Sequence, residues 1–263
     1  MSRFVYLFEL RGIQGFLFDS GRLKDMIQAS ELIDYVCRDP LDEALKAVSL
    51  DPATVHPRRA GGAAYLVMGD GDQAQRFRDL WNLTVRQMLP GIELVDVIAS
   101  GGTLREAVKQ GIETLQVERN RPLPELPGTT PLTQLAARTG KAAVALEHGE
   151  PIDQSTRVRR QAEREGAGLV GRFAATAEKW PDNFEADAQP HRRFPLNPDN
   201  LVGMVHLDGN GIGQLLRLLT DASQAMDDAG YVEVYSTFSS ELEKTTREAA
   251  QAATEEVLLR KAN

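Results

Sequence analysis

Apolar and polar positions in the first part of the chain alternate between strand-like and helix-like patterns. Apolar and aromatic residues dominate RFVYLFEL at residues 3–10, which predicts a buried strand. Helical spacing of apolar residues follows at residues 23–37, and a second, short helix is predicted to begin at Pro40. The segments TVHPRRA and AAYLVMGD then flank Gly61 and Gly62, a pair typical of a β-hairpin turn.

The pattern next predicts a helix at residues 72–89 and a strand, ELVDVIAS, at residues 93–100. The inner side of that helix is predicted to consist of Phe77, Leu80, Trp81, Val85 and Met88. The order of these elements is β-α-β-β-α-β, which is the ferredoxin-like motif of the α+β class. A further helix is predicted at residues 103–118, and prolines stop it.

A second strand-and-turn pattern lies in LVGMVHLDGNGIGQLLRLL at residues 201–219. The apolar run at 201–207 predicts a strand that ends at Asp208, and the apolar residues from Ile212 onward predict a helix. A long helix is predicted at residues 232–260. One strand and two helices cannot close a sheet, so the pattern predicts an incomplete domain at this end of the chain.

This second pattern has the residue types that hold a metal ion beside a phosphate chain. The end of the strand positions the carboxylate of Asp208, glycines let the backbone approach a ligand, and a helix N-terminus favours anions. The predicted nucleotide-binding loop consists of Gly209, Asn210, Gly211, Ile212 and Gly213. The glycine spacing matches neither a dinucleotide-binding fingerprint nor a P-loop. In the alternative interpretation, Asp208 merely caps the helix that follows.

The two strand-and-turn patterns are similar to each other. Aligning VYLFELRGIQGFL with VGMVHLDGNGIGQLL places Leu10-Arg11-Gly12 on Leu207-Asp208-Gly209, and a two-residue insertion follows. The chain is therefore predicted to hold two copies of one unit, the second incomplete, with Arg11 at the position of the acid. Chance similarity between two strand-glycine turns is the alternative.

Residues 121–200 have the least regular pattern, with one predicted helix at about 155–166. Four arginines of this helix, which are candidates for contact with an RNA phosphate backbone, are Arg157, Arg159, Arg160 and Arg164. The alternative is a solvated charged face, paired with neighbouring glutamates. The net charge of −8 argues against a whole-surface attraction to nucleic acid but allows a local basic patch.

Bulk composition sets broader limits. The 263 residues are enough for about two domains, and the 42% of apolar residues are enough for a buried core. The single cysteine, Cys37, excludes an internal disulfide. The chain starts without a signal peptide and has no apolar run long enough to span a membrane, so we expect a cytoplasmic protein without a membrane partner.

These motifs together resemble a known family. The turn Gly12-Ile13-Gln14-Gly15-Phe16, the segment Ala29-Ser30-Glu31-Leu32 and the later strand end His206-Leu207-Asp208-Gly209-Asn210 occur in order. In that combination the chain resembles the large, polymerase-like subunit of type III CRISPR effector complexes and its relatives with a second palm domain. The resemblance covers about residues 1–100 and 195–260.

The resemblance implies a domain organisation and an activity. Residues 1–102 would form a first, degenerate palm, residues 103–195 a helical and irregular connector, and residues 196–263 the start of a second palm. The family's active palm binds two Mg²⁺ or Mn²⁺ ions, with the strand-end acid, here Asp208, among the ligands. It uses ATP to make cyclic oligoadenylate messengers in antiviral defence when foreign RNA is sensed.

Departures from the family pattern change this expectation. The family's second set of acids lies on a Gly-Gly-Asp-Asp hairpin, whereas the Gly-Gly pair here continues as Gly61-Gly62-Ala63-Ala64. A partner chain or a C-terminal segment would have to complete the second palm, so the chain is predicted to be inactive alone. Two alternatives stay open: a non-catalytic scaffold that binds nucleotide or RNA together with a partner, and an unrelated α/β protein.

Overall fold

The computed structural model describes residues 2–55, 58–122, 129–161 and 211–256. The chain divides into two compact units. The first comprises Met1–Glu163 and Met226–Ser239, and the second comprises Arg164–Ala225 and Ser240–Asn263. The predicted domain boundaries at residues 102 and 195 stay a prediction.

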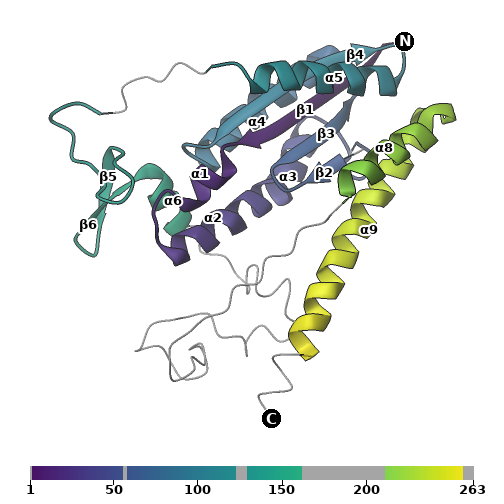
Figure 1. The fold of residues 1–263 in the computed structure, drawn as a ribbon. Coiled ribbons are helices and arrows are strands. Elements are labelled where there is room, and N and C mark those ends of the chain that lie inside the picture. The colour runs from purple at the N-terminus through teal and green to yellow at the C-terminus, as the bar shows by residue number, and fades with distance from the viewer. Residues whose placement is uncertain (1, 56–57, 123–128, 162–210, 257–263) are drawn as a thin grey trace. The chain divides into compact units, whose positions relative to one another are not determined.

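A four-stranded antiparallel sheet forms the centre of the first unit (Figure 1). Its order is β2-β3-β1-β4, so the first strand of the chain lies between the third and the fourth. The strands are β1 (Arg3–Arg11), β2 (Arg58–Ala60), β3 (Ala63–Met68) and β4 (Glu93–Gly101). Helices between them give the predicted β-α-β-β-α-β order, and the α+β class is confirmed.

Strand β1 is buried on both faces, which explains its nearly continuous apolar sequence. Tyr6 and Phe8 pack on one face with residues of the helices between β1 and β4, whereas Val5 and Leu7 pack on the other face. The first-face helices are α1 (Ile13–Phe18), α2 (Leu23–Val36), α3 (Asp39–Ala47) and α4 (Gly71–Met88). These bounds confirm the helices predicted at 23–37, from Pro40 and at 72–89.

Helix α1 differs from the sequence prediction, which placed no helix before residue 23. The helix begins directly after Gly12, which adopts a left-handed conformation (φ 70°, ψ 21°), and it continues through Gly15. Phe16 lies in the first-face core with 5% exposure. Burial of this aromatic ring outweighs the low helix propensity of glycine.

The second face of the sheet is covered by α5 (Leu104–Arg119) and by the first turns of α9 (Asp228–Thr254). A capping box of Thr103 and Glu106 begins α5. Asp228 joins α9 to this face, since its carboxylate accepts hydrogen bonds from Arg3 Nε at 2.6 Å and from the Leu104 backbone N–H at 2.9 Å. Both helices were predicted from periodicity and are confirmed within the described residues, whereas positions 257–260 of the longer prediction lie outside those residues.

The region predicted to be irregular contains a second, two-stranded sheet and a short helix. These elements are β5 (Ala143–Glu147), β6 (Glu150–Asp153) and α6 (Gln154–Gln161), and α6 lies against α2 (Figure 1). His148 (φ 51°) and Gly149 (φ 81°) form the tight turn between the two strands.

The second unit contains α8 (Ile212–Ala222) and a 3₁₀ turn (Ser223–Ala225) in its described part. This helix begins where the sequence predicted it, whereas the predicted strand at 201–207 lies outside the described residues. Within the described ranges, no helix is both long enough and apolar enough to cross a membrane.

Candidate nucleotide-binding site

The described part of the predicted nucleotide-binding loop, residues 211–213, forms the N-terminus of α8. Gly211 precedes the helix in a left-handed conformation (φ 83°, ψ 0°), and no side chain caps the helix. The free N–H groups of a first helical turn and the helix dipole together favour a bound anion. Asp208, Gly209 and Asn210 lie outside the described residues.

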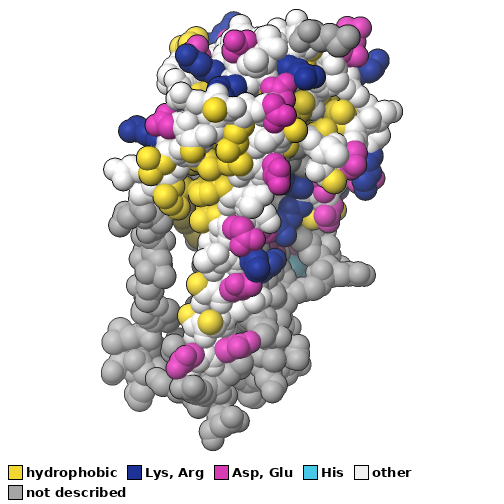
Figure 2. Space-filling view, turned by 90° about the vertical axis from the view of Figure 1, so that its right-hand side faces the viewer, with side chains coloured by type: hydrophobic (Ala, Val, Ile, Leu, Met, Phe, Trp, Pro, Cys, Tyr) yellow, Lys and Arg dark blue, Asp and Glu magenta, His cyan; other side chains and the backbone are white. Residues whose placement is uncertain are grey.

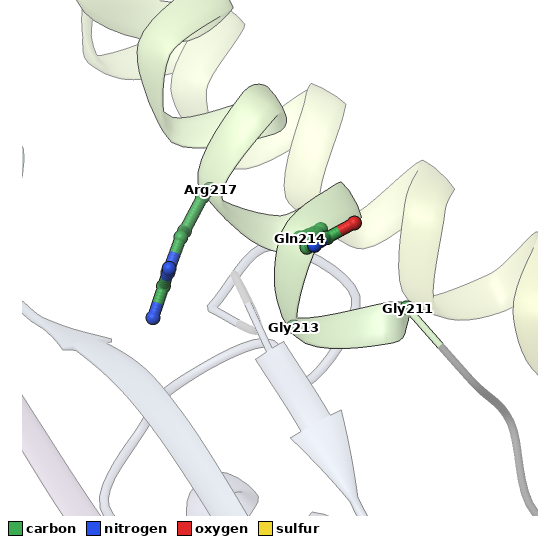
Figure 3. Close-up of a pocket in the computed structure, with 4 residues that line it drawn as sticks. All are labelled: Gly211, Gly213, Gln214 and Arg217. Atoms are coloured by element: carbon green, nitrogen blue, oxygen red, sulfur yellow. The ribbon is translucent and has the colours of Figure 1, made fainter.

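An open hollow of about 650 Å³ lies beside this turn, and it is lined by Gly211, Gly213, Gln214 and Arg217 (Figure 3). A Cβ atom added at Gly213 would meet no atom within 4 Å, so packing does not require a glycine there. Bare backbone at this position leaves room for a ligand to approach. Arg217 adds a permanent positive charge one turn further along the helix.

The described lining residues suit an anion such as a phosphate group better than they suit a metal ion. Backbone N–H groups, the amide of Gln214 and the guanidinium of Arg217 are all able to donate hydrogen bonds to phosphate oxygens. None of these lining residues has a carboxylate, which Mg²⁺ and Mn²⁺ prefer. Metal binding by Asp208 stays a prediction, since Asp208 lies outside the described residues.

The apolar side of α8 has no buried residue. Ile212, Leu215, Leu216 and Leu219 recur at helical spacing, and Leu215 is 49% exposed. Leu218 beside them is 65% exposed. A helix with so strong an apolar stripe normally packs against a sheet or another helix.

In the first unit, the position that corresponds to the Gly211 turn is the corner where β1 meets α1. The Leu10 N–H donates to the Gly62 carbonyl at 2.6 Å, and a Cβ atom at Gly62 would lie 2.8 Å from Ile13 Cδ1. The Gly61-Gly62 turn therefore packs directly against this corner, and it joins β2 and β3 as the predicted hairpin. Ala63 pairs with Glu9 in the strand register.

Charged side chains at this corner are paired with one another. Arg11 Nε lies 3.4 Å from Glu93 Oε2, and Arg119 forms a bidentate ion pair with Glu9. In the part of the chain that the structure describes, no group of three His, Cys, Asp or Glu side chains could hold a metal ion. The alanines after Gly62 and the arginine at the strand end thus supply no metal ligand at this corner.

Two of the four arginines in the predicted cluster form ion pairs with different aspartates. Arg159 is fully buried, donates to both oxygens of Asp19 at 2.6 and 3.1 Å, and lies 4.0 Å above the ring of Phe16. Arg160 pairs with both oxygens of Asp25 at 2.9 Å. Arg159 is therefore neither on a solvated face nor exposed toward a phosphate backbone.

Arg157 is half-buried, and Arg164 lies outside the described residues. On the face shown in Figure 2, basic and acidic side chains of the described residues are interspersed rather than gathered by sign. That distribution agrees with the net charge of −8. RNA contact by this cluster stays a prediction.

Aspartates at turns and helix starts of the first unit have two different roles. Asp70 does cap α4, since it accepts from the Gln73 N–H at 2.7 Å. Asp19 and Asp25 instead form ion pairs with α6. Burial opposes ionisation of Asp25, but hydrogen bonds and charge from Arg160 outweigh it, so the pKa of Asp25 lies below its ordinary value.

A second polar network was not predicted from the sequence. Asp96 on β4 accepts hydrogen bonds from the Tyr6 hydroxyl at 2.7 Å, from Asn82 Nδ2 at 2.6 Å and from Arg78 Nη2 at 2.8 Å. Burial and then the charge of Asp96 raise the pKa of Tyr6 well above its ordinary value. The sequence feature that indicates this network is Asp96, an aspartate within an otherwise apolar strand.

Comparison with known proteins returned structural matches alone. No family model matches this sequence, and no curated protein matches it. Crystal structures of the Csm1–Csm4 cassette, one in complex with one ATP and one in complex with cA4, match at 21% identity and a TM-score of 0.36 over 44% of this chain. The match covers 18% and 19% of those chains, so this chain spans less than a fifth of their length.

Proposed function

We propose that this chain is a palm-domain protein related to the polymerase-like subunit of type III CRISPR effector complexes. Residues 1–102 would provide a catalytically silent, ferredoxin-like palm, and residues from 196 onward would begin a second palm that binds ATP. The proposal joins the motif resemblance to the geometry of the two glycine turns.

One observation carries the proposal: the same unusual helix start occurs in both units. Gly12 and Gly211 each precede a helix in the left-handed conformation, each is followed by isoleucine, and neither helix has a side-chain cap. An ordinary N-cap residue has an extended backbone. The carbonyl of Gly12 accepts from Phe16, and that of Gly211 accepts from Leu215, at 2.9 and 3.0 Å.

The shared left-handed glycine at the two helix starts supports two copies of one unit. It also changes which residues of the two copies are aligned. Gly12-Ile13 corresponds to Gly211-Ile212, so the two extra residues lie between the strand and the turn instead of after the turn. Asp208 then precedes the longer loop of the second copy. A longer loop would give the second copy additional backbone N–H groups near the acid.

The composition of the first corner supports a silent first palm. A palm gathers carboxylates at the end of its first strand and on the adjacent hairpin, whereas Arg11, Ala63 and Ala64 are found here. The proposed ATP site therefore lies in the second copy, with Asp208 binding Mg²⁺ or Mn²⁺. When bound, the metal would neutralise phosphate charge and activate a ribose hydroxyl.

The second copy would need further metal ligands from a partner chain or a C-terminal segment. The uncovered apolar side of α8, with Leu215 and Leu218 exposed, supports such a partner because it resembles a helix face that packs on a sheet. The chain alone is then expected to bind ATP without turning it over.

Calorimetric titration with ATP in the presence of Mg²⁺ or Mn²⁺ tests the proposal. Arg217→Ala and Gly213→Ala are each expected to weaken ATP binding at least tenfold, and Asp208→Asn is expected to abolish the metal dependence. Gly15→Ala is the matched control, because Gly15 also lies in the first turn of a helix and a Cβ there would meet no atom within 4 Å. Equal ATP affinity in wild type and Gly213→Ala would refute the proposed site.

A further inference from the structure

Strand β4 (Glu93–Gly101) forms one edge of the four-stranded sheet, and β2 forms the other (Figure 1). The nine residues of β4 pair with β1 in an unbroken antiparallel register. Within the described part of the chain, no strand pairs with the other side of β4. Among the described residues, one long side of this strand is therefore available to a further strand.

The register shows which backbone groups of β4 point outward. The Leu10 N–H donates to the Gly62 carbonyl at 2.6 Å, so the even-numbered residues of β1 direct their backbone groups toward β3. The odd-numbered residues of β1 then direct theirs toward β4, and their partners on β4 are also odd-numbered. Within the described residues, the outward N–H and C=O groups of β4 have no hydrogen-bond partner. These groups belong to the even-numbered residues Leu94, Asp96, Ile98 and Ser100.

Neither the sequence nor the local structure of β4 protects this edge. Native sheets usually protect an edge by a short strand, a bulge, a proline or a lysine. Strand β2 follows that rule, since it has three residues and two of them are arginines, Arg58 and Arg59. The segment ELVDVIASG of β4 has no proline, no basic residue and no bulge in its pairing with β1. An unprotected edge of this length is suited to pairing with another strand.

The charges of β4 allow a second copy of the same strand to approach. Asp96 is neutralised by Arg78, whose Nη2 atom lies 2.8 Å from Asp96 Oδ1. Glu93 at the start of the strand is paired with Arg11, at 3.4 Å between Oε2 and Nε. Both acids of the strand are thus paired within the chain, and no unpaired charge of β4 would repel an identical edge.

The outward backbone groups of β4 are complementary to those of an identical strand. A two-fold axis at Val97 places Asp96 opposite Ile98 of a second copy. The same axis places Leu94 opposite Ser100 of that copy. These are the four outward residues, so every outward N–H of one strand meets an outward C=O of the other. On the second face of the sheet, Val97 lies opposite Val97 of the second copy, in the closer, non-hydrogen-bonded type of pair.

We propose that two copies of this chain associate through β4, in antiparallel register about Val97, so that their four-stranded sheets form one continuous sheet. The protected β2 strands become the two outer edges, so the assembly closes at two copies instead of growing into a fibre. The interface lies in the first unit, and it is independent of the proposed ATP site beside α8.

Sedimentation equilibrium of the full chain over a range of concentrations tests the association. The wild type is expected to change from one chain to two as its concentration rises. Ser100→Pro removes an outward N–H at an exposed position, which tolerates proline at a sheet edge, and is expected to weaken the association about tenfold. Ser100→Ala is the matched control, because it removes the hydroxyl but keeps the N–H and should associate as tightly as the wild type.

A cysteine at position 97 tests the register. In a non-hydrogen-bonded antiparallel pair the Cα atoms lie about 4.5 Å apart, within the range that a disulfide spans. Oxidised Val97→Cys is therefore expected to form a covalent dimer. Val95→Cys is the matched control, because Val95 has similar burial but would lie opposite Ala99 of the second copy. Cys37, the single natural cysteine, is buried and should stay reduced in both variants.

Amide hydrogen exchange distinguishes this dimer from other ways of covering the edge. The N–H groups of Val95 and Val97 donate to β1 and should exchange slowly in every variant that folds. Those of Asp96 and Ile98 should exchange slowly in the dimer, whereas they should exchange fast when dilution or Ser100→Pro dissociates it. The alternation of slow and fast amides along one strand also shows that the Ser100→Pro variant keeps its sheet.

A chain that stays monomeric at every concentration would overturn the proposal. Slow exchange at Asp96 and Ile98 in that monomer would show that another segment of the same chain covers β4, and fast exchange would show an open edge. Association of Ser100→Pro as tight as that of the wild type would overturn the use of β4, and absence of the disulfide in Val97→Cys would overturn the register. Arg217→Ala, which is expected to weaken ATP binding, should leave the association unchanged.

Discussion

The substitution Asp19→Ala removes the carboxylate that faces the buried guanidinium of Arg159. Both terminal nitrogens of Arg159 donate to Asp19, at 2.6 and 3.1 Å, and the Arg159 side chain has no exposed surface. After the substitution, the remaining partners of the cation would be the Ser155 hydroxyl at 2.9 Å and the ring of Phe16. The variant therefore leaves a buried charge without a counter-ion.

The size of the effect follows from that geometry. Removing one partner of a buried ion pair costs about 3–5 kcal/mol. Because Ser155 and Phe16 still contact the guanidinium, we expect Asp19→Ala to lower the free energy of unfolding by about 3 kcal/mol, the lower end of that range. The substitution Arg159→Met should cost less, about 1–2 kcal/mol, because Asp19 is 15% exposed and keeps Lys141 at 2.9 Å.

Urea unfolding followed by far-UV circular dichroism at pH 7 measures these free energies of unfolding. The double variant Asp19→Ala/Arg159→Met should be more stable than Asp19→Ala alone, since no buried charge remains. Glu43→Ala is the control, because it breaks an exposed, solvent-screened pair with Lys46 and should leave the free energy of unfolding nearly unchanged. A loss below about 1 kcal/mol in Asp19→Ala, or a double variant no more stable than it, would refute the reasoning.

Three further outcomes are expected in the same unfolding assay. Gly62→Ala should destabilise the protein by about 2 kcal/mol, because Gly62 has a φ of 81° and its new Cβ would lie 2.8 Å from Ile13 Cδ1; Ile13→Val should recover part of the loss. Asp96→Ala should cost about 1–3 kcal/mol because the buried Tyr6 hydroxyl loses its acceptor, and an unchanged unfolding midpoint would contradict this. The pKa of Asp25 is lowered in the folded state, so the ionised carboxylate stabilises the protein above the unfolded pKa of about 4. This stabilisation is lost as the pH falls through the folded pKa. Asp25→Asn should therefore make the free energy of unfolding depend less on pH between pH 2 and pH 6.

Local features of the fold were predictable from the sequence. The strand predicted at residues 3–10 is Arg3–Arg11, and the helix predicted at 72–89 is Gly71–Met88. The Gly61-Gly62 turn joins the predicted hairpin. Each of these depends on residues within a few positions of one another, so apolar spacing and turn preference were sufficient.

Two local elements were missed although the sequence contained a signal. Helix α1 includes Gly15, which disfavours a helix, but the burial of Phe16 stabilises it. The β5–β6 hairpin turns at His148-Gly149, a two-residue loop with glycine at its second position. The prolines and charges around it obscured the alternation of its short strands.

The sequence by its own pattern specified most of the strands and helices around the four-stranded sheet and which of their faces are apolar, whereas the strand before the second glycine turn stays a prediction. Tertiary structure alone decided that β1 lies at the centre of the sheet and that Arg159 and Arg160 meet Asp19 and Asp25, which are 140 and 135 residues away. Strand order depends on loop closure and on the packing of both faces, and a long-range ion pair depends on where α6 packs. Strand order and long-range ion pairs cannot be predicted from sequence periodicity, because the groups that determine them are neighbours in space and not along the chain.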